Sequence, residues 1–196
     1  GAMMHRDSLG VVQRITPGAV NWMAAGRGIV HSERVPDDIR NDKVPVHGLQ
    51  MWVALPKDQE QGAASFHHYA EDDMPRIDVG GADLHLLAGK AYGHESPVKT
   101  SSPTLYICGR IKAGGTLNLP ADYSERAVYV VTGAATLDGE ALEAGVLAIL
   151  EPGVDVLLTA QSDTLFMVLG GEPIDGPRFV WWNFVASSKE LIESAK

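Results

Sequence analysis

Apolar and polar residues alternate in short runs along most of the chain, and Gly and Pro separate these runs at close intervals. The runs are rich in Val, Ile, Leu and Tyr. Runs of about four to eight such residues, bounded by turn-forming residues, are typical of β-strands. The pattern predicts strands at residues 11–15, 48–55, 84–88, 104–111, 127–131, 146–150, 154–159 and 164–169.

A helical pattern occurs only near the C-terminus. Ser187 is followed three residues later by Glu190, which is the spacing of a capping box, and Leu191 and Ile192 supply a short apolar stripe. The chain is therefore predicted to be all-β with one short C-terminal helix. Because open sheet edges promote aggregation, we expect so many short strands to stack as sandwiches or close into barrels.

The length of the chain limits the number of domains. Its 196 residues give room for one large domain or two of about 100 residues. The polar segment 62–75 is interpreted as a connection between two β-rich halves. We place the boundary inside it, so that residues 1–65 form a first domain and residues 66–196 form a second.

The charge balance excludes some partners. The chain has 16 Lys and Arg against 25 Asp and Glu, a net charge of −9, and no basic run. Electrostatic binding to nucleic acid or to an anionic membrane is therefore not expected. No apolar run approaches the ~18 residues of a membrane helix, and the start does not resemble a signal peptide, so we expect a cytoplasmic protein. The single cysteine, Cys108, lies in an apolar run and is interpreted as a buried hydrophobe rather than a nucleophile.

His31 and Glu33 form the most suggestive local pair. Residues two apart on a strand point to the same face, so these side chains can converge on one centre. An imidazole with a carboxylate suits a divalent first-row metal such as Fe(II) or Mn(II). A hydrogen-bonded histidine beside a solvated glutamate explains the same spacing, and the pair alone does not choose between these interpretations.

The other candidate residues give weaker signals. His67 and His68 are adjacent and are assigned to a surface loop, and His5 is assigned to a turn near the start of the chain. Trp22 and Trp52 are expected in the core, with a pocket wall as the alternative. No nucleophile elbow, P-loop or dinucleotide fingerprint is present. The remaining histidines are interpreted as loop or strand-surface residues: His47, His85 and His94.

Several longer strings are more specific than these spacings. They are DSLG at 7–10, ITPGAVNWMAAGRGIVHSE at 15–33, HGLQMWVALP at 47–56, SPV at 96–98, ERAVYVV at 125–131 and GGEP at 170–173. Together they closely resemble the pirin family over nearly the whole chain. The resemblance implies a bicupin of the cupin superfamily, in which two β-barrel or jelly-roll domains pack face to face and the N-terminal one holds the metal.

The resemblance also implies which residues bind the metal. Pirins hold it, usually as iron, with three histidines and one glutamate, and His31 and Glu33 fall on the last two of these positions. The other two ligands form a His-x-His pair upstream of the turn at 7–10, and the chain begins at Gly1, just before that turn. We therefore expect an incomplete first barrel. Fe(II), the cofactor expected for the full-length family, should bind weakly or not at all.

The second barrel is expected to lack a metal. In cupins at large a His-x-His follows a Gly and precedes a Glu and a further Gly. The matching stretch here is 115–119, followed by Glu125 and Gly133, and its histidine positions are occupied by Leu117 and Leu119 or their neighbours. Aliphatic side chains cannot bind a metal, so this barrel is expected to contribute packing and stability.

The resemblance implies quercetin 2,3-dioxygenase activity, the O2-dependent ring opening of a flavonol-like substrate, with Glu33 as a general base beside the metal. One alternative is a non-catalytic, redox-sensing regulatory module whose acidic surface suits a protein partner. Another is a truncated remnant in which only the second cupin is intact. Sheet edges left open in the first barrel predict a homo-oligomer.

Overall fold

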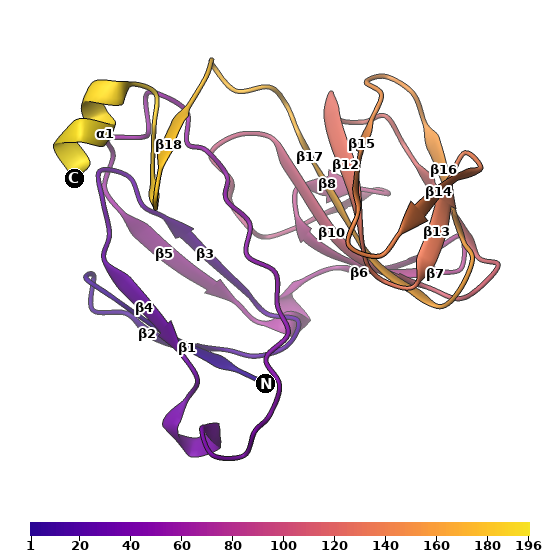
Figure 1. Ribbon diagram of the computed structural model, residues 1–196, viewed down its shortest axis with the longest axis horizontal. Coiled ribbons are helices and arrows are strands. Elements are labelled where there is room, and N and C mark those ends of the chain that lie inside the picture. The colour runs from indigo at the N-terminus through magenta and orange to yellow at the C-terminus, as the bar shows by residue number, and fades with distance from the viewer. The chain divides into compact units, whose positions relative to one another are not determined.

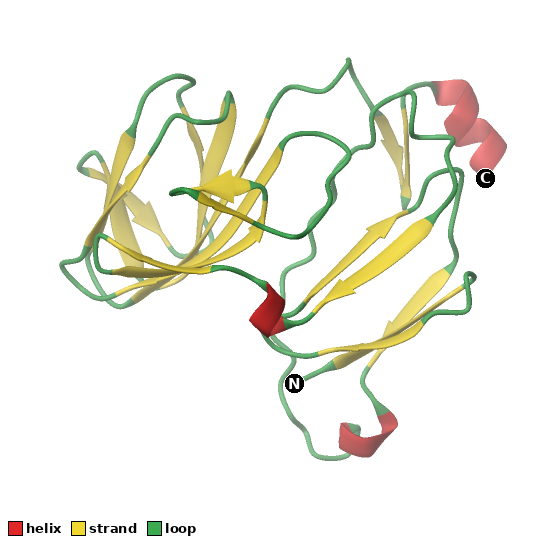
Figure 2. Cartoon of the chain, turned by 180° about the vertical axis from the view of Figure 1, so that it is seen from behind, coloured by secondary structure: helices red, strands yellow, loops and turns green.

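Strands form most of the regular structure in the computed structural model, which describes residues 1–196 (Figures 1 and 2). The expectation of an all-β chain with one short C-terminal helix is confirmed. The chain divides into two compact units: unit 1 is Gly1–Asp73 with Ile174–Lys196, and unit 2 is Met74–Pro173. The predicted boundary between the two cupin domains, at residue 65, is not tested by this division and stays a prediction. The compact units instead group the C-terminal helix with unit 1.

Unit 1 consists of three small antiparallel sheets and the terminal helix. In the first sheet β1 lies between β2 and β4, in the second β3 pairs with β5, and in the third β18 pairs with β19. The bounds of these elements are β1 (Met3–Asp7), β2 (Val12–Ile15), β3 (Val20–Ala24), β4 (His31–Arg34), β5 (Ser65–Tyr69), β18 (Phe179–Trp181), β19 (Phe184–Ala186), α1 (Lys189–Ala195) and the 3₁₀ turns η1 (Asp37–Ile39) and η2 (Glu71–Asp73).

Unit 2 contains the larger sheets. A six-stranded sheet has the order β15-β12-β17-β10-β7-β6, a four-stranded sheet has the order β11-β16-β13-β14, and β8 pairs with β9. The bounds are β6 (Arg76–Val79), β7 (Ala82–Ala88), β8 (Lys90–Ala91), β9 (His94–Glu95), β10 (Thr104–Ile111), β11 (Thr116–Leu119), β12 (Glu125–Thr132), β13 (Ala134–Leu137), β14 (Glu140–Glu143), β15 (Leu147–Leu150), β16 (Val156–Ala160) and β17 (Thr164–Gly171).

The core of unit 2 joins its two main sheets. Alternate residues of each strand point to one face, and buried side chains from both sheets form one apolar cluster that includes Phe166 and Leu158. A Cβ atom at Gly109 would lie 2.2 Å from the Phe166 ring, so the glycine gives the ring its space. Leu117 and Leu119, the residues expected at the histidine positions of a metal-binding cupin, are 1% and 2% exposed in this cluster.

Two predictions about unit 1 are wrong. Residues 48–55 form no strand, and the side chain of Trp52, expected in the core, is 54% exposed. A strand needs a neighbour to accept its backbone hydrogen bonds, and this segment joins no sheet. In contrast, the segment 62–75 contains β5, which pairs with β3 through contacts such as Met23 opposite Phe66.

The predicted helix is present, but its cap lies one residue further along. Ser188 is the N-cap, and its hydroxyl accepts a hydrogen bond from the backbone N–H of Leu191 at 3.3 Å. Ser187 instead binds the buried carboxylate of Glu60 through its backbone N–H and its hydroxyl. Ser187 and Ser188 are adjacent, and the hydrogen bonds of Ser187 with Glu60 leave Ser188 as the N-cap.

Candidate functional site

Four residues with acid–base or metal-binding side chains share one face of the β1–β4 ladder. The antiparallel register places His5 opposite Glu33 and Asp7 opposite His31. Residues two apart on one strand point to the same side, so all four side chains lie on the same face. The prediction that His31 and Glu33 share a face is thereby confirmed, because both lie in β4.

The turn after β1 fixes one end of this face. The Asp7 carboxylate accepts hydrogen bonds from the backbone N–H groups of Leu9 and Val11 at 2.9 and 3.1 Å. Gly10 closes the turn with a φ of 85°, a conformation that favours glycine. Ser8 then exchanges hydrogen bonds with Val30, since its N–H donates to the Val30 carbonyl and its hydroxyl accepts from the Val30 N–H. The turn thus holds the residue immediately before His31.

His5 is the buried centre of the face, 1% exposed. Its Nε2 lies 2.9 Å from the Asp7 carboxylate, and its Nδ1 lies 3.8 Å from Oε1 of Glu33. Its ring stacks on Phe66 with a centroid distance of 4.3 Å and on His31 at 5.6 Å. The carboxylate of Asp7 therefore orients the ring, and two aromatic rings hold its plane.

The prediction that His5 lies in a turn is wrong, since it lies in β1. Its place was missed because the run Met3–Asp7 shows no clear apolar alternation. The His-x-Asp spacing of His5 and Asp7, which matches the His-x-Glu spacing of His31 and Glu33, is the signal that could have identified it.

His31 and Glu33 are accessible to a ligand. Both residues are exposed, and the Glu33 side chain is 38% exposed. An exposed carboxylate beside two imidazoles can accept a proton or bind a cation. The face is thus suited to acid–base chemistry on a small molecule that reaches it from solvent.

The residues present do not form a complete metal site. No group of three or more His, Cys, Asp or Glu side chains in the structure is arranged to hold a metal ion. His31 and Glu33 offer two donors on one face, whereas protein sites for first-row metals commonly use at least three protein ligands. The assignment of these two residues as metal ligands therefore stays a prediction.

The other histidines do not join this face. His67 and His68 lie in β5 rather than in the predicted loop, and Nδ1 of His68 is 2.7 Å from the side-chain oxygen of Asn21. The interpretation of two others is wrong: His85 is buried in β7 rather than at a strand surface, and His94 lies in the short strand β9 rather than in a loop, where its Nδ1 donates to the carbonyl of Tyr92. His47 is exposed outside any strand.

Cys108 gives no sign of an activated thiol. It is half-buried on β10, and burial raises the pKa of its thiol. A raised pKa lowers the fraction of thiolate, which is the nucleophilic form. This supports the interpretation of Cys108 as a packing residue.

Asp7→Asn is expected to reduce the acid sensitivity of unit 1. Burial acts to raise the pKa of Asp7. Hydrogen bonds from His5 and from the backbone N–H groups of Val11 and Leu9 have the larger combined effect, so the pKa of Asp7 lies below 3.8. A lowered pKa in the folded state stabilises the fold above pH 3.8, and this contribution disappears as the pH falls through the folded-state value.

We therefore expect Asp7→Asn to be less stable than the unchanged chain at pH 7, with the difference shrinking as the pH falls below 3.8. Urea unfolding across this range measures it, and Asp42→Asn, at an exposed turn residue, is the control. An equal difference at every pH would contradict the assignment.

The comparisons with known proteins cover the whole chain. Residues 1–53 match the family Pirin, and residues 106–196 match the Pirin C-terminal cupin domain. The chain is 44% identical to a pirin-like protein of Caulobacter vibrioides over 197 residues, covering 100% of this chain and 68% of the relative. It is 31% identical to Pirin-1 of Arabidopsis thaliana, again over 100% of this chain and 69% of the relative.

A solved structure agrees with these relatives. The crystal structure of quercetin 2,3-dioxygenase from Acinetobacter baumannii matches with a TM-score of 0.91 at 30% identity, covering 100% of this chain and 69% of that one. The chain thus spans about two thirds of the length of the proteins it matches. Both halves match the same family, and the relatives align from the first strand to the terminal helix, so the chain belongs to the pirin family.

Proposed function

We propose that this chain carries the reactive face of a quercetin 2,3-dioxygenase-type enzyme, which opens a ring of a flavonol-like substrate with O2. The observation that carries the proposal is the match of the entire chain, at a TM-score of 0.91, to a structure named as quercetin 2,3-dioxygenase. The face formed by His5, Asp7, His31 and Glu33 supplies groups suited to such a reaction.

Glu33 is the proposed general base. A flavonol must lose a hydroxyl proton before its ring carbon can react as an enolate with O2. In this step the substrate O–H bond breaks, a Glu33 carboxyl O–H bond forms, and the electron pair stays on the substrate oxygen. The exposed carboxylate of Glu33 is open to a planar phenol, and His5 lies on its inner side at 3.8 Å.

His5 and Asp7 are proposed to position this base. His5 is fixed by the Asp7 carboxylate and by stacking on Phe66, so it presents a constant surface to Glu33 and His31. A catalytic group must be held close to its productive geometry, and a buried, hydrogen-bonded neighbour provides that restraint.

Fe(II) remains the proposed cofactor of the full-length family, with His31 and Glu33 among its ligands. Bound iron would activate the substrate oxygen and O2 as a Lewis acid and redox centre. In the structure, His31 and Glu33 belong to no group of three or more side chains arranged to hold a metal ion. No step of the reaction is therefore assigned to a metal in this chain.

The setting of the enzyme is also proposed. The structure contains no helix that is long and apolar enough to cross a membrane, and we propose a cytoplasmic location.

β2 and β4 are the edges of their sheet, and edges of this kind can pair with a second copy of the chain. A homo-oligomer is therefore proposed, and no observation favours the non-catalytic regulatory alternative.

The experiment that tests the function is a flavonol oxidation assay. The chain is mixed with quercetin in aerated buffer that contains Fe(II), without a desalting step because a two-donor site would lose its iron, while the flavonol absorbance is followed. We expect quercetin to disappear faster than with iron in buffer alone, and His31→Ala to remove the difference. Equal rates with and without the protein would contradict the proposal.

A further inference from the structure

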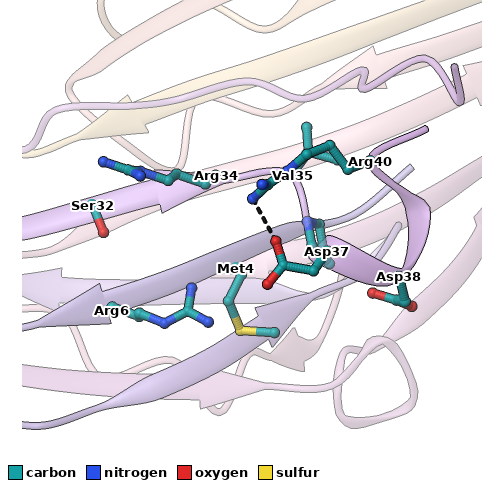
Figure 3. Close-up of a pocket in the computed structure, with 9 residues that line it drawn as sticks. Met4, Arg6, Ser32, Arg34, Val35, Asp37, Asp38 and Arg40 are labelled. Carbon is teal, nitrogen blue, oxygen red and sulfur yellow. Dashed lines mark ion pairs between the residues drawn. The ribbon is translucent and has the colours of Figure 1, made fainter. Parts of the chain in front are cut away.

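The opposite face of the same two strands forms a pocket with a different chemistry. Met4 and Arg6 of β1 and Ser32 and Arg34 of β4 alternate with the residues of the candidate site, so they point to the other side. They line a pocket of about 530 Å³. The segment that follows β4 completes the lining with Val35, Pro36, Asp37, Asp38 and Arg40 (Figure 3).

Arg6 and Arg34 are neighbours across the β1–β4 ladder and line the same pocket. The register places Arg6 opposite Ser32 and Met4 opposite Arg34, so the two arginines are diagonal neighbours on adjacent strands. Diagonal Cβ atoms in a sheet are about 7–8 Å apart, which long side chains can bridge. Figure 3 shows Ser32 on the same wall as the two arginines, where its hydroxyl adds a third donor.

The acidic residues of the pocket are already paired. Asp37 binds Arg40 at 2.5 Å, and Asp38 binds Arg14 at 2.8 Å. The hydrogen bond from Arg14 also lowers the pKa of Asp38, which keeps that carboxylate charged. Arg6 and Arg34 make no ion pair in the structure, so two guanidinium groups remain available.

This arrangement reverses the charge balance of the chain. Three arginines and two aspartates line the pocket, and Arg14 from outside the lining pairs with one of the aspartates, although the chain as a whole has a net charge of −9. Guanidinium groups present a planar fork of donors that matches a carboxylate or a phosphate. Two adjacent cations repel each other, and an anion between them relieves that repulsion.

We propose that this pocket binds a small oxyanion, a carboxylate or a phosphate, through Arg6, Arg34 and the hydroxyl of Ser32. Met4 and Val35 supply apolar surface beside these donors, which can contact the body of an organic anion. The site is on the other face of the sheet from His31 and Glu33, so it does not depend on the proposed dioxygenase activity.

Calorimetric titration of the whole chain at low salt tests the proposal, with inorganic phosphate and benzoate as separate probes. We expect at least one probe to bind with a Kd on the order of 1 mM. Arg6→Gln and Arg34→Gln should each weaken that binding about fivefold to tenfold, because each removes a charged donor. The probe that binds identifies the ligand as a phosphate or a carboxylate.

Two further variants make the result specific. Arg27→Gln removes the same charge from an exposed turn residue outside the pocket, and binding should change less than about twofold. Ser32→Ala keeps every charge, and binding should weaken about threefold, so it tests the site even if an arginine variant misfolds. Absence of binding by both probes, or equal losses in Arg27→Gln and Arg6→Gln, would overturn the proposal.

Discussion

Glu33→Gln is expected to lower kcat/KM for quercetin oxidation by about 100-fold or more, since a positioned general base contributes roughly 10²–10⁴ in rate. The glutamine amide has nearly the same shape, but it cannot accept the substrate proton. The Glu33 side chain is 38% exposed and lies 3.8 Å from Nδ1 of His5, so the replacement should not disturb the sheet. Steady-state rates with quercetin at saturating O2 measure the effect.

The control for this variant keeps the same chemistry at a distant position. Glu140 is exposed in β14 of unit 2, and Glu140→Gln should keep the rate of the unchanged chain. Glu33→Asp retains a carboxylate on a shorter side chain and should recover part of the rate lost in Glu33→Gln. A Glu33→Gln chain that oxidises quercetin as fast as Glu140→Gln would remove Glu33 from the mechanism.

Arg126→Met is expected to lower the free energy of unfolding by about 3 kcal/mol. Arg126 is 3% exposed, and its Nη1 donates to the carbonyls of Leu119 and Pro120 at 3.1 and 3.0 Å. Its Nη2 donates to the carbonyls of Glu151 and Val154 at 3.0 and 2.6 Å. The side chain therefore connects two loops of unit 2 through hydrogen bonds. Methionine would fill its space but could not donate hydrogen bonds to these carbonyls.

Urea unfolding of the unchanged chain and of three variants measures this loss. Arg126→Lys keeps the charge with fewer donors in a different geometry and should fall between the unchanged chain and Arg126→Met. Arg110→Met, at an exposed position of β10, should change the stability by less than about 0.5 kcal/mol. Similar unfolding midpoints for Arg126→Met and Arg110→Met would show that the four carbonyl contacts contribute little.

Strands with strong apolar patterns could be predicted from the sequence. The runs at 104–111 and 164–169 correspond to β10 and β17, which pair with each other at the centre of the six-stranded sheet. The residues of β10 alternate between buried and more exposed positions, whereas β17 has three consecutive buried residues, so its signal is a continuous apolar run.

Partners distant in sequence could not be predicted in this way. The apolar run at 48–55 reads as a strand, but pairing depends on a neighbouring strand that the local pattern does not report. β5 was missed for the complementary reason, because His67 and His68 make its sequence polar while β3 supplies the pairing.

The candidate site shows the same division. The spacing of His31 and Glu33 identifies one strand of the reactive face, because a period of two is local information. The contribution of His5 and Asp7 depends on the register between β1 and β4. The turn at Asp7 and the hydrogen bonds between Ser8 and Val30 fix that register. Register of this kind is set by tertiary contacts, and only the structure reveals it.

The most direct test of the proposed function follows the oxygen atoms when the chain reacts with quercetin under ¹⁸O2 in buffer that contains Fe(II). A dioxygenase transfers both atoms of one O2 molecule to its products, so mass spectrometry should find two ¹⁸O atoms for each quercetin consumed, and Glu33→Gln should yield almost none of this product. Loss of quercetin without ¹⁸O in the organic products would contradict the account, because O2 would then act only as an electron acceptor.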